Sequence, residues 1–215
     1  VRGTGARGEA APGAVAAGIR SAADAGARVV YVGVALTLGR PEMTAAVAYA
    51  TRKDVLVVAP AAPDALPSSS GIGAAPSAPP AQPYFPAFIP QVVSVEDFGE
   101  DGSRPKDAPS IFAADQAAPG DAVVSIGPKG IGHFIGSGSS LAAANVAGTA
   151  ALIRAYEPRL TAAEVARRLV VSAYPAAVPL LDPYAAVSAV SSMATAAAVP
   201  QPERAVRMPR HDSQA

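Results

Sequence analysis

The sequence predicts an α/β fold in which a mostly parallel sheet is flanked by helices. Residues 28–36 and 55–59 are almost continuously apolar and rich in β-branched side chains, which is typical of strands buried on both faces of a parallel sheet. A helical pattern at residues 42–51 separates them, so the three segments form a βαβ unit with a right-handed crossover. Half of the 215 residues are hydrophobic, which is enough for a sizeable core.

Two helices alternate with these strands. The first is expected over residues 14–25, after Pro12, with apolar residues on one face and Gly26 as its C-cap. The second covers residues 42–51 and carries an acidic side chain in its first turn, where the helix dipole favours it. Residues 1–11, rich in Gly and Arg, are expected to form a loop.

The middle of the chain changes character at residues 60–90. This window holds nine prolines and a run of three serines, so we expect a long surface loop. A third strand is expected at residues 91–95. Shorter strands are expected at 111–114, 122–126 and 133–135.

Three helices complete the pattern. Residues 141–156 are apolar on nearly every side, which indicates a buried helix, and residues 183–191 predict a short terminal one. Between them, residues 160–173 form a helix in which Thr161 and Glu164 have the spacing of a capping box.

The domain organisation follows from these elements. We expect one incomplete domain over residues 1–198 and a polar, disordered tail over 199–215. Val1 in place of Met suggests a fragment, a maturation product or a misassigned start codon.

The most informative segment runs from Gly136 to Gly148 (GSGSSLAAANVAG), where glycines and serines lead directly into the apolar helix. A helix N-terminus presents free N–H groups and a partial positive charge, so a serine placed there is built like a nucleophile elbow. The segment resembles the Gly-Thr-Ser-x-Ala-x-Pro-x-Val-Ala-Gly motif of subtilisin-like proteases. That resemblance makes Ser140 the nucleophile position; the alternative is that its hydroxyl is an inherited N-cap.

Other segments follow the same family's order. Residues 25–30 (AGARVV) resemble its "GADVI" strand, residues 117–125 (AAPGDAVVS) its "AAPGxxVxS" segment, and residues 181–187 (LDPYAAV) its closing "VDPxxAV" segment. Within the family the chain looks most like the mycosins of actinobacterial type VII secretion. The resemblance implies the later two-thirds of a subtilisin-like three-layer fold without its early strands, and a location outside the cytoplasm, at the cell envelope.

The family's catalytic Asp and His belong to segments that precede the region matched by Val1. The chain's histidines are His133, expected at a strand edge, and His211, expected in the tail. Arg2 stands in a faint echo of a His-Gly-Thr motif. Loss of the His base costs a factor on the order of 10⁶, a value measured on subtilisin itself, so the resemblance predicts a chain that is inactive alone.

The oxyanion loop departs from the family as well. The residue aligned with the family's oxyanion Asn is Pro63, which has neither a side-chain nor a backbone N–H donor. Loss of that donor costs about 10² to 10³ in rate, again measured on subtilisin. The family's substrate-pairing strand is represented by Gly33, Val34 and Ala35. Asp64, next to Pro63, is expected to be a solvated turn residue.

Several function classes are excluded. Lys plus Arg equals Asp plus Glu at 17 each, which argues against nucleic acid as a partner. The chain has no Cys, and no His, Asp and Glu cluster has the spacing of metal ligands, so we expect no metal and no cofactor. The longest apolar run, residues 141–153, is too short for a membrane span.

Two functions remain open. The first is a catalytically defective subtilisin-like domain with a structural or peptide-binding role. The second is an active, mycosin-like serine endopeptidase whose Asp and His lie in an N-terminal part. Without the early strands the sheet has an open edge, so we expect an extended peptide, an N-terminal fragment or a partner chain to cover it.

Overall fold

The structure, a computed structural model, describes residues 10–64, 81–105, 108–126 and 132–189. Most of the expected N-terminal loop, the interior of the proline-rich window and the tail over 199–215 lie outside these ranges, as do Arg2 and His211.

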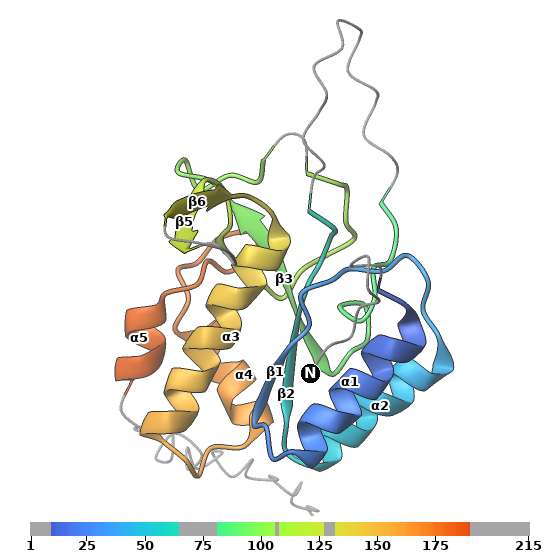
Figure 1. Cartoon of the computed structure of the whole chain (residues 1–215). Helices are drawn as coiled ribbons and strands as arrows, with labels where there is room; N and C mark the ends of the chain where they lie inside the picture. Colours follow the sequence, from blue (N-terminus) through green and yellow to red (C-terminus); the bar gives the residue numbers. More distant parts are fainter. Residues whose placement is uncertain (1–9, 65–80, 106–107, 127–131, 190–215) are drawn as a thin grey trace, which may run out of the picture.

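A four-stranded parallel sheet forms the centre of the fold, in the order β1 (Val29–Tyr31), β2 (Leu56–Pro60), β3 (Val92–Phe98) and β4 (Gln116–Pro119) (Figure 1). Every residue of β2 is buried. The predicted parallel sheet is confirmed, and β1 is one of its edge strands.

Helices cover both faces of the sheet, which makes three layers. On one face lie α1 (Pro12–Asp24) and α2 (Pro41–Arg52); on the other lie α3 (Ser139–Tyr156), α4 (Ala162–Val171) and α5 (Pro183–Ser188) (Figure 1). The predicted fold class is therefore confirmed.

Strand β2 contributes to both cores because successive side chains of a strand point to opposite faces. Val57 and Ala59 pack in the cluster with α1 and α2, whereas Leu56 and Val58 pack in the cluster with α3 and α4. In the second cluster α3 presents alanines, which allow a close approach between helix and sheet.

The strand expected over residues 28–36 is shorter than predicted. The ladder to β2 ends with the bond from Val32 N–H to the Val58 carbonyl (2.9 Å). Beyond it the chain turns to a different partner, and Leu36 and Phe85 form an isolated antiparallel bridge with N–O distances of 2.8 and 2.7 Å. Apolar character continues along the segment because it is packed there, although it has left the sheet.

Two further expectations need correction. No strand forms at residues 111–114; the strand at this place is β4, and its approach is fixed by Asp115, whose carboxylate accepts from Ser94 N–H and Oγ. The ends of the proline-rich window are also packed, since Pro60 belongs to β2 and Tyr84 is buried.

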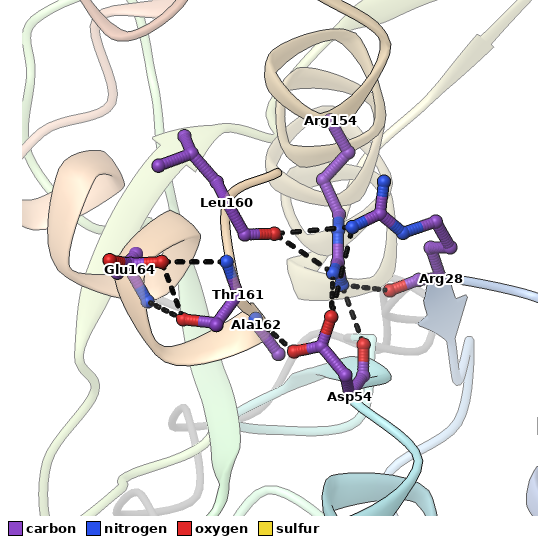
Figure 2. Close-up of polar contacts among 7 residues, drawn as sticks. All are labelled: Arg28, Asp54, Arg154, Leu160, Thr161, Ala162 and Glu164. Carbon is purple, nitrogen blue, oxygen red and sulfur yellow. Dashed lines mark hydrogen bonds and ion pairs between the residues drawn. The ribbon is translucent and has the colours of Figure 1, made fainter. Parts of the chain in front are cut away.

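The remaining elements agree with the sequence. Strands β5 (Val123–Ile126) and β6 (His133–Gly136) pair antiparallel, and β6 leads into α3. The capping box of α4 is present, with Thr161 and Glu164 each bonded to the other's backbone N–H (Figure 2).

A polar cluster joins the C-terminal end of α3 to the turn before β2 (Figure 2). Arg154, whose side chain is 3% exposed, pairs with the carboxylate of Asp54 and donates to the carbonyls of Arg28, Asp54 and Leu160. Asp54 also accepts from the N–H of Ala162, at the start of α4 (2.6 Å). These bonds hold three elements that are far apart in sequence.

Candidate active site

The candidate site lies where the carboxyl ends of the parallel strands meet the N-terminal end of α3. Open parallel sheets place ligand sites at this edge because strand ends, loops and helix N-termini converge there. Ser140 is the second residue of α3, and Tyr31 ends β1. Asp97 lies near the end of β3, and Asp64 lies four residues beyond β2.

Gly138 shapes the turn into α3. Its φ of 137° and ψ of 163° lie in a region that only glycine adopts readily. A Cβ there would also collide with the carboxylate of Asp64. The Gly138 N–H donates to the Gly120 carbonyl at 2.7 Å, which ties the turn to the segment after β4.

Every polar group of Ser140 has a partner from another part of the chain. Its N–H donates to Asp64 Oδ1 at 2.9 Å, and its Oγ donates to Asp64 Oδ2 at 2.5 Å. Its carbonyl accepts from the Tyr31 hydroxyl at 2.9 Å. The carboxylate of Asp64 therefore covers the side of Ser140 that carries both donors.

These contacts correct two expectations. Asp64 is exposed but is not simply a solvated turn residue, because it binds Ser140 through both oxygens. The hydroxyl of Ser140 is not an N-cap, because the N-cap residue of α3 is Gly138, which has no side chain to cap the helix.

A second carboxylate lies beneath the first serine of the helix. Ser139 Oγ donates to Asp97 Oδ1 at 2.5 Å, and both residues are buried, with 2% and 4% exposure. Gly120 leaves room for this pair, since a Cβ there would lie 2.5 Å from Asp97 Cβ. This contact was not foreseen from the sequence, although an acidic residue in an apolar strand is itself a signal.

Tyr31 closes the β1 side of the site. Its ring lies over Gly33, where a Cβ would lie 2.7 Å from the hydroxyl oxygen. Burial raises the pKa of Tyr31, and the negative charge of Asp64 raises it further. The phenol therefore stays protonated at neutral pH and can donate to Ser140.

The other predicted site residues lie nearby but are not all joined to Ser140. Pro63 directly precedes Asp64 and is half-buried. Gly33 is exposed and Val34 and Ala35 are half-buried, on the segment that leaves the sheet edge after β1. The structure assigns no role to Pro63 or to these three residues, which remain predictions.

His133 is not part of the site. It is exposed in β6, where it pairs with Ile126, and within the described ranges Ser140 bonds to a carboxylate and a phenol but to no imidazole. No group of three or more His, Asp or Glu among the described residues could hold a metal ion. In the same residues, no helix combines the length and apolarity that a membrane crossing requires.

Comparison with known proteins gives a consistent picture. No family model matches the chain. Thermitase from Thermoactinomyces vulgaris is 31% identical over 140 residues, which are 65% of this chain and 45% of thermitase. This chain therefore spans less than half the length of that curated relative.

Solved structures resemble the described fold more broadly. MycP1 with its N-terminal propeptide removed superimposes with a TM-score of 0.70 at 26% identity, over 87% of this chain and 69% of that one. MycP3 protease of the type VII (ESX-3) secretion system gives a TM-score of 0.66 at 28% identity, over 82% and 58%. A chain of the periplasmic assembly of the ESX-5 inner membrane complex, 23% identical, shares the fold over 95% of this chain and 57% of that one, with a TM-score of 0.69.

Proposed function

Because the chain belongs to the subtilisin-like serine protease family and is mycosin-like in fold, we propose that it is a subtilisin-like domain that binds an extended peptide without cleaving it by itself. On this proposal Ser140 keeps the nucleophile's place but lacks the surroundings that peptide cleavage requires.

The proposal rests mainly on the contact between Ser140 and Asp64. Acyl transfer needs N–H donors aimed at the oxygen that becomes negative, and removing one of them costs about 10² to 10³ in rate in subtilisin. Here a carboxylate, which only accepts hydrogen bonds when ionised, takes the N–H of Ser140. Pro63, aligned with the family's amide donor, has no N–H to offer.

Peptide binding is proposed for the open side of the sheet. Among the described residues β1 pairs with β2 and with no other strand, so we propose that the backbone groups on its other side pair with an added strand. In the family, the segment matched by Gly33, Val34 and Ala35 pairs with bound peptide. An extended segment of a partner chain would add main-chain hydrogen bonds there.

The setting is proposed from the relatives. MycP3 belongs to a type VII secretion system, and the ESX-5 chain belongs to a periplasmic assembly. We place this domain in such an envelope assembly, outside the cytoplasm, with an actinobacterial source fitting its Ala-, Arg- and Pro-rich composition. Its partner would then be a protein segment that completes the sheet edge.

The second candidate is an active serine endopeptidase whose Asp and His come from an N-terminal part. Fluorophosphonate labelling separates the two. We expect no Ser140-dependent labelling of the chain, alone or with a polypeptide encoded upstream, with Ser140→Ala as the control. Labelling that requires the upstream polypeptide and disappears in Ser140→Ala would establish the endopeptidase instead.

Peptide binding has its own test. Titration of the isotope-labelled chain with N-acetyl-tetraalanine amide is expected to shift the backbone amide signals of Gly33, Val34 and Ala35. Unchanged signals at these positions, with the peptide in large excess, would contradict the proposed binding edge.

A further inference from the structure

We propose that Asp64 is an internal ligand that closes the serine site, so that its carboxylate keeps negatively charged tetrahedral species away from Ser140. The inference rests on the proposed function in one respect, namely that Ser140 occupies the family's nucleophile position. It goes further by naming the residue that holds the site closed and the substitution that opens it.

The first argument comes from the hydrogen bonds between Asp64 and Ser140. Asp64 uses one oxygen for the Ser140 N–H (2.9 Å) and the other for the Ser140 hydroxyl (2.5 Å). Any group added to Oγ would bring a negative oxygen toward that same N–H. The added group and the carboxylate cannot both have the donor, so the carboxylate has to leave before the adduct forms.

The second argument comes from the negative charge of Asp64. The N-terminal end of a helix favours one nearby negative charge, and α3 is 18 residues long. Asp64 already provides that charge. A second one on Ser140 would be repelled at short range by the first, because like charges within a few ångströms disfavour each other.

Packing holds the carboxylate in place. The loop before it is anchored by the bond from Ala61 N–H to the Val95 carbonyl at 2.7 Å, and Ala62 is fully buried. Pro63 then restricts the backbone that leads into Asp64. On the other side, the missing side chain of Gly138 makes the room that the carboxylate fills.

Asp64→Asn is the informative change. The amide has the shape of the carboxylate, so the loop can keep its path, but it carries no charge and offers two N–H donors. A residue that repels a negative oxygen thus becomes one that can donate to it. We therefore expect the variant to admit a negatively charged group at Ser140 without removing any atom that the loop packs against.

Phenylboronic acid is a suitable probe because it turns serine hydroxyls into tetrahedral anionic adducts. Ser140 Oγ adds to the trigonal boron, the O–H bond breaks, its proton passes to solvent, and the boron becomes tetrahedral and negatively charged. The step involves no oxidation or reduction. Boron-11 NMR and calorimetry on the full chain report adduct formation and its dissociation constant.

We expect Asp64→Asn to bind phenylboronic acid at least about tenfold more tightly than the unmodified chain. This gain is smaller than the factor of about 10² to 10³ in rate that one oxyanion donor contributes in subtilisin. Asp64→Asn/Ser140→Ala should form no adduct. Asp121→Asn is the matched control, because Asp121 is a nearby exposed carboxylate that accepts from Ser137 rather than Ser140. It should bind like the unmodified chain.

Equal affinity in Asp64→Asn and the unmodified chain, including no adduct in either, overturns the proposal. An equal gain in Asp121→Asn also overturns it, because the effect would then be general charge. Hydrogen exchange of the Ser140 amide in the unmodified chain tests the contact without a variant: slow exchange is expected, and exchange at the rate of an open amide overturns it. Fluorophosphonate labelling of the unmodified chain bears on the proposed function, whereas the affinity ratio bears on Asp64.

Discussion

At its C-terminal end α3 carries Arg154, whose side chain is almost fully buried and whose donors reach three carbonyls and Asp54 (Figure 2). At its N-terminal end it carries Ser140, whose donors go to the exposed Asp64. Both ends match the helix dipole, with a cation at one and an anion at the other. They differ in burial: the Arg154 side chain is enclosed by the elements that it joins, whereas the contact between Ser140 and Asp64 lies at an exposed position.

The difference separates a structural contact from one that we propose to be functional. Arg154 contacts backbone groups before β2 and around α4, so its loss would disturb several elements together. Asp64 accepts hydrogen bonds from one described residue, Ser140, so we expect its loss to change the start of α3 and little else. The variants below test this contrast, from the largest expected effect to the smallest.

Arg154→Ala is expected to lower the free energy of unfolding by about 3 kcal/mol, because carbonyls buried under the guanidinium lose their charged donor and Asp54 loses its cation. Urea denaturation measures the loss. Arg159→Ala, at an exposed position in the following turn, should stay within about 0.5 kcal/mol. Similar losses in the two variants would show that the cluster has no special structural role.

Gly138→Ala is expected to cost about 2 kcal/mol, because the backbone there is suited to glycine and a Cβ meets the Asp64 carboxylate. Gly148→Ala, in the middle of α3 with open space around it, should instead stabilise by about 1 kcal/mol. Thermal unfolding of both variants measures these changes in stability. A destabilised Gly148→Ala would mean that this face of α3 is packed against another group in solution.

Ser139→Ala is expected to cost about 1.5 kcal/mol, because it takes a hydroxyl donor from the buried Asp97. Ser140→Ala should cost less than about 0.5 kcal/mol, because water can replace the hydroxyl at the exposed Asp64. Comparing the two by denaturation tests whether burial, rather than the hydrogen bond alone, sets the cost. Equal costs would argue against it.

Acid should weaken the Arg154 cluster. Partial burial raises the pKa of Asp54, but hydrogen bonds from Ala162 N–H and Arg154 outweigh it, so its pKa is lowered below the ordinary 3.8. A lowered folded-state pKa gives stability that is present above 3.8 and is lost as the pH falls through the folded value. Because the side chain is 47% exposed, we expect solvent to limit this contribution to about 1 kcal/mol.

Asp54→Asn measures that contribution. Asn tolerates the positive φ of 59° at this position, so the backbone should be retained. The variant is expected to be less stable than the unmodified chain at neutral pH and to approach it in strong acid, as the pH falls below the lowered pKa of Asp54. A gap that stays constant between neutral pH and strong acid would rule out titration of Asp54 as the cause.

The order of helices and strands was predictable because it depends on local patterns. The continuous apolar run in β2 and the capping box of α4 are readable from neighbouring residues. Ser140 is identified as a candidate by a local motif too, and its role as the nucleophile position stays a prediction. The exact end of β1 was not predictable, because the apolar pattern continues to Leu36, which pairs with Phe85 outside the sheet.

The partners of the serines were not predictable in the same way. Asp64 lies 76 residues before Ser140, Tyr31 lies 109 before it, and Asp97 lies 42 before Ser139. No local period links such positions, since the sheet topology brings them together. Alignment of the oxyanion loop identifies Pro63, and only the path of the backbone reveals that its neighbour contacts the serine.

The register of the sheet also determines where Asp64 lies relative to Ser140. Strand β2 is fixed lengthwise by the register Val58↔Val93 and Pro60↔Val95, and only three residues lie between Pro60 and Asp64. An added residue in this span could displace the carboxylate by about 3.3 Å, more than a hydrogen bond tolerates. Lengthening or shortening this connection by one residue would thus break the hydrogen bonds between Asp64 and Ser140, while the packing of both hydrophobic clusters is retained.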